Sequence, residues 1–401
     1  MKLVFVMVGF TFFSPSMIAG GKLALGLDAT SFILAVVIGN LFLAAYTGSL
    51  AYISQKTGLN LDLLAQRAFG RRGSYLPSAL ISLTQMGWFG VGVAMLSLPL
   101  AQMAHPGLIL GLPNGVVFTL VIGVLMSVTA ALGIRALAVF GTIAVPLILV
   151  LGIYSNVLSV AKLGGLSGLM GAGGTGTAVT MSLALTMVIG NFVSGGTATP
   201  NFARFGRTAK QSVAATVLAF LVGNIIMFVF GAIGAAAYGE ADIFNVLIIQ
   251  GLTIPAFITL GLNIWSTNNN ALYTSGLGFT HILRTPVRWT TFGAGVVGTV
   301  FALFLYNNFV GYLSLLGSMI PPVGIILILH FALNRRSFIA EAHAASCGSR
   351  GLCADWLALV ALVGGVIFGL LVQAGITPLN SLIAATVIYL VGHFATGRNK
   401  H

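Results

Sequence analysis

Charged residues are scarce in this chain. Of its 401 residues, 6% are charged and 58% are hydrophobic, and the mean hydropathy is +1.04. A soluble domain needs a charged surface, so this composition excludes an ordinary soluble protein and indicates a polytopic membrane protein. At about 20 residues per helical span plus short loops, the length accommodates about twelve spans.

Acidic residues are the rarest charged type, with 6 Asp and Glu against 18 Lys and Arg and a net charge of +12. Basic residues lie in short loops between apolar spans, which argues against nucleic acid as a partner and for a lipid bilayer. Only Lys22 and Lys162 fall on one side of the predicted membrane, which leaves 16 of the 18 on the other. The positive-inside rule therefore predicts that both termini are cytoplasmic.

Cysteine is nearly absent. The two cysteines, Cys347 and Cys353, fall at the last large cytoplasmic loop, where a disulfide is not expected and a metal site would need more ligands. We expect two free thiols. No metal cluster or nucleophile–base pair appears within the predicted spans, so the chain is not expected to be an enzyme.

The apolar runs predict an all-α protein of one transmembrane transporter domain covering residues 1–401. We expect spans at 3–20, 31–53, 78–103, 114–133, 136–156, 179–200, 211–237, 253–274, 290–306, 309–333, 353–373 and 377–396.

Two of these spans contain segments typical of broken membrane helices, Phe12–Ser16 and Asn191–Gly196. A break at membrane depth leaves backbone groups unpaired, so it persists only where it is buried in protein or lines a cavity. A pair of interrupted spans in corresponding positions of two halves indicates the binding site of a transporter.

Short sequence motifs of the first half of the chain recur in the second half, five spans later. The run Gly9–Ser14 resembles Gly190–Ser194, and Gln85–Trp88 lies where Asn263–Trp265 lies in the later half. An odd offset reverses the orientation of the second unit. We therefore predict an inverted repeat of five plus five spans, with residues 1–156 and 179–333 as the repeats and 353–396 as two additional helices.

The eighth span carries a polar face. Asn263, Ser266, Thr267 and Asn270 are spaced to share one side of a helix. Hydrogen bonding between helices would explain the hydroxyls alone, but this density of amides favours a lined cavity. No carboxylate falls inside a span except Asp355 at the start of the eleventh, so the pattern favours a metal cation held by neutral oxygens over a proton relay. Na⁺ suits such ligands.

The third span places Gln85 and Trp88 on one helical face. A tryptophan beside an amide suits a planar ligand, because the ring stacks while the amide reads polar edges. Packing alone would also explain a mid-span tryptophan. With Phe192 at the second break able to close the stack, we favour ligand binding.

Several segments closely resemble the bacterial cytosine permeases of the nucleobase–cation symporter family. These are Phe5–Gly20, Gln85–Met95, Phe202–Arg207, Gly261–Asn268 and Leu305–Gly311. The resemblance covers nearly the whole chain. It implies a leucine-transporter-like fold with helices 1 and 6 broken, location in the bacterial inner (plasma) membrane, and inward symport of a nucleobase with Na⁺.

The resemblance also implies site residues. The sodium site would use main-chain carbonyls of the first span and a carbonyl plus two hydroxyls of the eighth, at Gly9, Phe12, Asn263, Ser266 and Thr267.

For the substrate site, the resemblance implies a base held between Trp88 and Phe192. Its edges would be read by Gln85, Ser14, Ser194, Gly195 and an asparagine of the eighth span. The motif matches Asn268 for that asparagine, whereas helix geometry prefers Asn270, and both remain candidates.

We therefore expect a secondary active symporter that imports cytosine with Na⁺ by alternating access, with no obligatory protein partner evident. Pro15 and Asn191 stand where the family has small residues, and Asn269 stands where it has Asp. The cargo could therefore be another planar nucleobase or ureide, such as uracil, a purine, hydantoin or allantoin. Proton-coupled uptake is a further alternative. A channel fits less well, because two substrate-lined breaks favour an occluding carrier.

Overall fold

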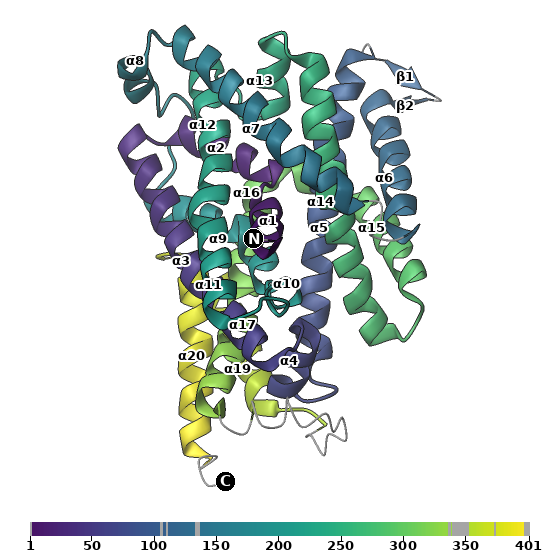
Figure 1. Cartoon of the computed structure of the whole chain (residues 1–401), viewed down its shortest axis with the longest axis vertical. Coiled ribbons are helices and arrows are strands. Elements are labelled where there is room, and N and C mark those ends of the chain that lie inside the picture. The colour runs from purple at the N-terminus through teal and green to yellow at the C-terminus, as the bar shows by residue number, and fades with distance from the viewer. Residues whose placement is uncertain are drawn as a thin grey trace.

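The computed structural model describes residues 2–104, 107–109, 111–132, 137–335, 338, 353–372 and 374–396. Helices run mostly along the long axis of the molecule and form a bundle with short connections at both ends (Figure 1). Cys347 lies outside the described residues, and Cys353 is an exposed free thiol.

The first half of the chain contains eight helices and one small hairpin among its described residues. They are α1 (Lys2–Thr11), α2 (Ser14–Gly26), α3 (Ala29–Thr57), α4 (Leu61–Phe69), α5 (Tyr75–Met103), β1 (Leu108–Ile109), β2 (Leu112–Pro113), α6 (Asn114–Leu132), α7 (Leu137–Lys162) and α8 (Leu166–Gly171).

The second half continues the same pattern and includes one π-helical segment, η2. Its elements are α9 (Met181–Thr197), α10 (Pro200–Ala203), α11 (Ala209–Leu218), η2 (Ala219–Asn224), α12 (Ile225–Tyr238), α13 (Ile243–Ile249), α14 (Thr253–Leu283), α15 (Val287–Asn307), α16 (Phe309–Met319), α17 (Pro321–Leu333), α19 (Trp356–Leu371) and α20 (Thr377–Ala395).

Each predicted span falls on one helix or on an interrupted pair of helices, except 211–237, which falls on α11, η2 and α12. Within the described part of the chain, eight helices are long and apolar enough to cross a membrane by length and composition. The others are shorter pieces or, in α14, a 31-residue helix with a polar stripe. The sequence did not indicate the hairpin or the short helices α8 and α13, and α14 runs nine residues beyond the predicted end at 274.

The predicted break in the first span is confirmed, because α1 ends at Thr11 and α2 begins at Ser14. The predicted position of the second break is wrong. Helix α9 continues through Asn191–Gly196 and ends at Thr197, and the interruption falls at Ala198 and Thr199. Pro200 has no N–H to donate to the carbonyl of Gly196, which instead accepts from the N–H of Thr199 at 3.1 Å, so the helix stops here.

The helices separate into two groups in Figure 1. We call α1, α2, α3, α9, α11, η2 and α12 the first helix group, and α5, α6, α14 and α15 the second helix group. Within the first group α2 packs extensively on α12, and within the second α5 packs on α14 and α15. Helix α7 crosses obliquely and touches both groups.

Two glycines allow α2 and α12 to pack at backbone distance. A Cβ at Gly20 would lie 2.1 Å from the carbonyl oxygen of Phe228, and one at Gly231 would lie 1.8 Å from that of Met17. Small residues let membrane helices approach closely. The second half of the interrupted span, α2, is therefore packed closely within the first helix group.

The charge asymmetry generates a prediction about orientation. Gly171 ends α8 at the end of the bundle that also carries α13, and Arg207 lies in the connection between α10 and α11. Both positions are exposed. In a background with Cys347 and Cys353 replaced by serine, Gly171→Cys should react with an impermeant thiol reagent on intact cells. Arg207→Cys should react only after permeabilisation, because its loop is predicted to be cytoplasmic. The reverse labelling pattern would contradict the orientation.

Candidate functional site

The interrupted first span is bridged by one side chain of α14. Asn263 donates from Nδ2 to the carbonyl of Phe12 at 2.9 Å, and its Oδ1 accepts from the hydroxyl of Ser14 at 2.7 Å. Asn263 is buried. Phe12 is the residue after α1, and its carbonyl has lost the regular helical partner. A single amide therefore joins the two halves of the broken span to α14.

The backbone carbonyl of Asn263 accepts hydrogen bonds from two side chains of the same helix. The hydroxyls of Ser266 and Thr267 both donate to it, each at 2.9 Å. Two of the predicted cation ligands are thus hydrogen-bonded to a third, the carbonyl of Asn263, and the fourth, the carbonyl of Phe12, is linked to them through the Asn263 side chain. Each hydroxyl oxygen keeps lone pairs while it donates, so it can still coordinate a cation.

Gly9, the fifth predicted ligand, stands apart from these contacts. It lies one turn before the break, and the nearest neighbour to a Cβ built there is Cγ2 of Val145 on α7, at 3.8 Å. Among the described residues, no side-chain hydrogen bond joins Gly9 to α14.

Gln85, Trp88 and Ser194 meet between the two helix groups. The hydroxyl oxygen of Ser194, on α9, accepts from Nε1 of Trp88 at 3.1 Å and from Nε2 of Gln85 at 3.3 Å. All three side chains are buried. Gln85 and Trp88 therefore lie on one face of α5, as their spacing predicts, and share a partner from the sixth span.

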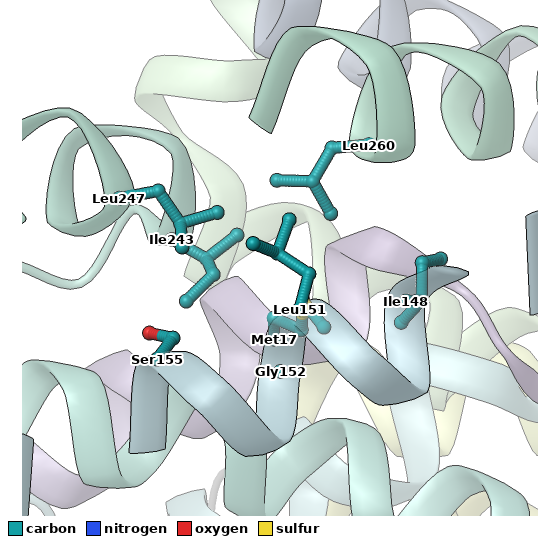
Figure 2. A pocket seen from close by; sticks show the side chains of 8 residues that line it. All are labelled: Met17, Ile148, Leu151, Gly152, Ser155, Ile243, Leu247 and Leu260. Carbon is teal, nitrogen blue, oxygen red and sulfur yellow. The ribbon is translucent and has the colours of Figure 1, made fainter. Parts of the chain in front are cut away.

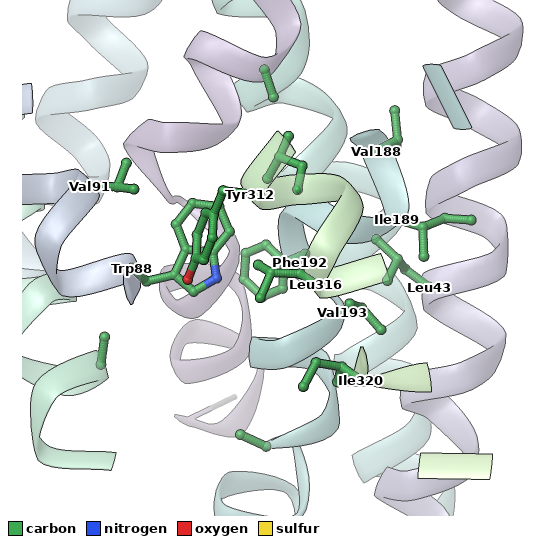
Figure 3. Packing of buried hydrophobic residues seen from close by; sticks show 14 of the residues in the cluster. Leu43, Trp88, Val91, Val188, Ile189, Phe192, Val193, Tyr312, Leu316 and Ile320 are labelled. Atoms are coloured by element: carbon green, nitrogen blue, oxygen red, sulfur yellow. The ribbon is translucent and has the colours of Figure 1, made fainter. Parts of the chain in front are cut away.

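An aromatic cluster surrounds this hydrogen-bonded trio. Trp88 and Phe192 reach toward each other from α5 and α9, with Tyr312 of α16 beside Trp88 (Figure 3). The rings of Trp88 and Tyr312 are 5.3 Å apart and nearly perpendicular. Phe13, which lies in the break of the first span, contacts Trp88 at 5.0 Å and Phe192 at 5.8 Å between ring centroids. Sequence reasoning missed Phe13, although it directly precedes the predicted Ser14.

Neither candidate asparagine of the eighth span forms a hydrogen bond with this cluster among the described residues. Asn268 donates to the carbonyl of Phe89 on α5 at 3.0 Å and lies against Gly92, where a Cβ would be 2.1 Å from its Oδ1. Asn270 is exposed. Gly195 lies beside the cluster, because a Cβ there would be 3.1 Å from the ring of Phe192.

A buried polar chain that the sequence analysis did not identify ties the first helix group together. Asn191 donates to Ser16 at 2.8 Å, Ser16 donates to Oδ1 of Asn224 at 3.0 Å, and Asn224 donates to Oδ1 of Asn40 at 2.7 Å. These residues come from α9, α2, η2 and α3. Asn40 and Asn224 lie inside apolar spans, where an unpaired amide is energetically costly. Their presence there was the sequence signal that could have identified this chain of hydrogen bonds.

A second polar cluster lies between α12 and α13. Asp242 is buried and accepts from the backbone N–H of Phe244 at 2.8 Å and from the hydroxyl of Tyr306. A cavity of about 70 Å³ beside it is lined by Ile18, Lys22, Glu240, Ala241, Asp242 and Tyr306. Burial raises the pKa of Asp242 to about 6, and the hydrogen bond from Tyr306 opposes that rise in part.

A further cavity, between α2, α7, α13 and α14, is not a nucleobase site. Its volume is about 10 Å³, and its walls are aliphatic apart from Ser155 (Figure 2). That is about the space needed for one water molecule. The residues suited to a planar ligand are instead packed against one another around Trp88.

Comparison with known proteins connects this arrangement to membrane permeases. Residues 2–393 match the family described as permeases for cytosine/purines, uracil, thiamine and allantoin. The chain is 47% identical over 391 residues to a cytosine permease of Escherichia coli (strain K12), covering 98% of this chain and 90% of that protein. It is 27% identical to a hydantoin permease of Microbacterium maritypicum, covering 80% of this chain and 70% of the other.

Solved structures share the fold. The inward-facing conformation of Mhp1 superposes with a TM-score of 0.83 at 20% identity, covering 99% of this chain and 90% of the other. A closed form of Mhp1, a nucleobase–cation-symport-1 family transporter with bromovinylhydantoin bound, gives 0.78 at 21% identity, with 99% and 92% covered. The predicted leucine-transporter-like fold is thereby confirmed.

The bridge across the first break generates a prediction about stability. Asn263→Ala removes the partner of the Phe12 carbonyl and of the Ser14 hydroxyl, and each buried group left unpaired costs about 1–3 kcal/mol. The purified variant should therefore unfold at a clearly lower temperature than the parent. Asn270→Ala, the same exchange at an exposed position of α14, is the control and should change little. Equal melting temperatures for Asn263→Ala and the parent would show that the bridge carries no stability.

Proposed function

The chain belongs to the family of permeases for cytosine, purines, uracil, thiamine and allantoin, and we propose that it imports cytosine together with Na⁺ by alternating access. Family and fold make it a multi-pass membrane transporter of nucleobase-type substrates and not an enzyme. We further propose that it lies in the inner membrane with both termini in the cytoplasm, as the distribution of Lys and Arg predicts.

The convergence of Gln85, Trp88 and Ser194 is the observation that carries the proposed substrate class. It places a large aromatic face and polar groups together at the boundary between the two helix groups. A planar base presents π faces and hydrogen-bonding edges, which such a site matches. Trp88 and Phe192 would supply the faces, and Gln85, Ser194 and Ser14 the edges. The curated relative at 47% identity is a cytosine permease, which favours cytosine among planar bases.

The difference at Asn191 bears on the alternative cargoes. The Asn191 amide donates to Ser16, in the polar chain that joins the first helix group. Among the described residues it forms no hydrogen bond with the aromatic cluster. The difference therefore gives no specific reason to prefer uracil, a purine or a ureide over cytosine.

The proposed Na⁺ site is built from neutral oxygens at the first break. Carbonyls freed by a broken helix and hydroxyls of a facing helix are suited to Na⁺ in transporters of this kind. Phe12, Asn263, Ser266 and Thr267 supply such oxygens next to one another. Gly9 would join them if its carbonyl turned toward α14. Ser14 is held by Asn263, so the cation and the base would share one structural element, which couples their binding.

Proton coupling is the alternative that a specific observation supports. Asp242 is a buried carboxylate whose pKa is raised to about 6, beside a cavity and outside the predicted spans. It could change protonation near neutral pH, whereas the proposed Na⁺ site contains no titratable group.

Uptake into proteoliposomes separates these possibilities. Labelled cytosine should accumulate when Na⁺ is higher outside, and should not accumulate with a pH gradient alone. Thr267→Ala removes one proposed ligand oxygen, so the Na⁺ concentration for half-maximal uptake should rise, with a loss of about 1–3 kcal/mol in cation binding.

Thr274→Ala is the matched control for that variant. Thr274 lies on the same helix and donates to the carbonyl four residues earlier at 2.8 Å, as Thr267 does at 2.9 Å. Its Na⁺ dependence should remain that of the parent. A Thr267→Ala protein with unchanged Na⁺ dependence would refute the ion site, and uptake driven by protons alone would refute Na⁺ coupling.

The role of Trp88 predicts a graded response. Trp88→Ala should weaken cytosine binding by about 1–3 kcal/mol, the usual contribution of one stacked base, and Trp88→Phe should lose less because a π face remains. Trp265→Ala is the control, since Trp265 donates to Thr129 at 3.1 Å, away from the cluster. Competition binding on purified protein measures all three. If Trp88→Ala bound cytosine like the parent, Trp88 would serve only in packing.

A further inference from the structure

Phe13 contacts both rings that are proposed to enclose the base. Its ring is 5.0 Å from Trp88 with an interplanar angle of 78°, and 5.8 Å from Phe192 with an angle of 81°. Both are edge-to-face contacts, a preferred geometry for aromatic pairs. The Phe13 ring contacts Trp88 and Phe192 at once, so it occupies space beside both rings that a base stacked on them would also need.

The polar groups near Phe13 are also paired within the protein. Gln85 and Trp88 share the hydroxyl oxygen of Ser194. On either side of Phe13 along the chain, the carbonyl of Phe12 and the hydroxyl of Ser14 are both held by Asn263. The backbone of Phe13 is extended, with φ −116° and ψ 113°, between the two helical halves. Its side chain is half-buried and can turn without breaking a helical hydrogen bond.

We propose that Phe13 is an internal competitor for the nucleobase: its ring occupies the stacking space beside Trp88 and Phe192 and must swing out before a base can bind. This inference rests on the proposed function and adds a residue to it. The apparent affinity for the base is then lower than the affinity of the site with Phe13 displaced. The reason is that only the fraction of molecules with Phe13 displaced is competent to bind.

Phe13 is also connected to the proposed cation site through Asn263. Phe13 is flanked by the two groups that Asn263 holds, and Asn263 supplies the carbonyl that meets Ser266 and Thr267. A cation that draws the Phe12 carbonyl away from the Asn263 amide would loosen the anchor beside Phe13. Cation binding therefore favours release of the ring, and the base gains affinity in its presence.

Equilibrium binding of labelled cytosine to the purified protein in saturating Na⁺ tests the inference. Phe13→Ala should bind cytosine about threefold to tenfold more tightly than the parent, because the base no longer displaces two aromatic contacts. Its affinity should also depend less on Na⁺. Phe13→Leu, which keeps an apolar side chain but has no ring, should give a smaller change in the same direction and decides the question if Phe13→Ala does not fold.

Phe10→Ala is the matched control. Phe10 also contacts Phe192 edge-to-face, at 5.2 Å, but its other recorded ring partner is Phe202 rather than Trp88. Its affinity for cytosine should stay within about twofold of the parent, since the stacking space remains occupied by Phe13.

The outcomes separate the inference from the proposed function. A parent protein that binds no planar base would refute the proposed function and the competitor with it. A parent that binds cytosine, together with Phe13 variants that bind equally or more weakly, would overturn the competitor alone and make Phe13 part of the binding surface or a bystander. A structure with cytosine bound should show the Phe13 ring out of contact with both Trp88 and Phe192, and a ring still in contact with both would likewise overturn the inference.

Discussion

The interruption of the first span governs how the binding region is built. Backbone groups that lose their helical partners inside a bilayer must be paired by the protein, because hydrocarbon provides no alternative. Asn263 meets this requirement with its side chain while its own carbonyl gathers Ser266 and Thr267. The same residue thus satisfies the break and organises the oxygens opposite it. A shift of α2 against α14 would alter the bridge to Phe12 and Ser14, whereas the bonds of Ser266 and Thr267 lie within α14 and would move with it.

The polar contacts differ in where they lie relative to the two helix groups. The chain from Asn191 through Ser16 and Asn224 to Asn40 joins four elements of the first group to each other. The contacts of Ser194 with Gln85 and Trp88, and of Ser14 with Asn263, instead cross from one group to the other. A transporter that moves one group against the other would keep the first set intact and remake the second. The proposed base and cation sites lie among the contacts that would change.

Hydrophobic runs and a proline-containing polar segment were enough to predict the spans and the first break, because both reflect the cost of placing backbone and side chains in lipid. The second break was misplaced, since glycine and asparagine permit a break without requiring one, whereas Pro200 removes a donor outright. Side-chain direction was the harder problem. Asn268 donates to the backbone of α5, and Phe13 packs in the aromatic cluster. Both orientations depend on contacts between helices, which the residue pattern of one helix does not contain. Gln85 and Trp88 were predictable as a pair, but not their shared partner Ser194.

The π-helical segment η2 has a consequence for how this chain tolerates change in its length. Its wider turn places the carbonyl of Ala219 where the hydroxyl of Thr11 donates to it at 3.0 Å, and it ends at Asn224, which joins the buried polar chain. The extra residue of a π-helical turn is absorbed locally, so deleting one residue here would close the segment into a regular α-helix and leave α12 close to its present orientation relative to α11. The carbonyl of Ala219 would then return to the regular helical hydrogen-bond pattern, and the hydroxyl of Thr11 would lose its acceptor. A one-residue gap in an alignment at 219–224 would therefore signal a lost contact with the first span in an otherwise similar bundle.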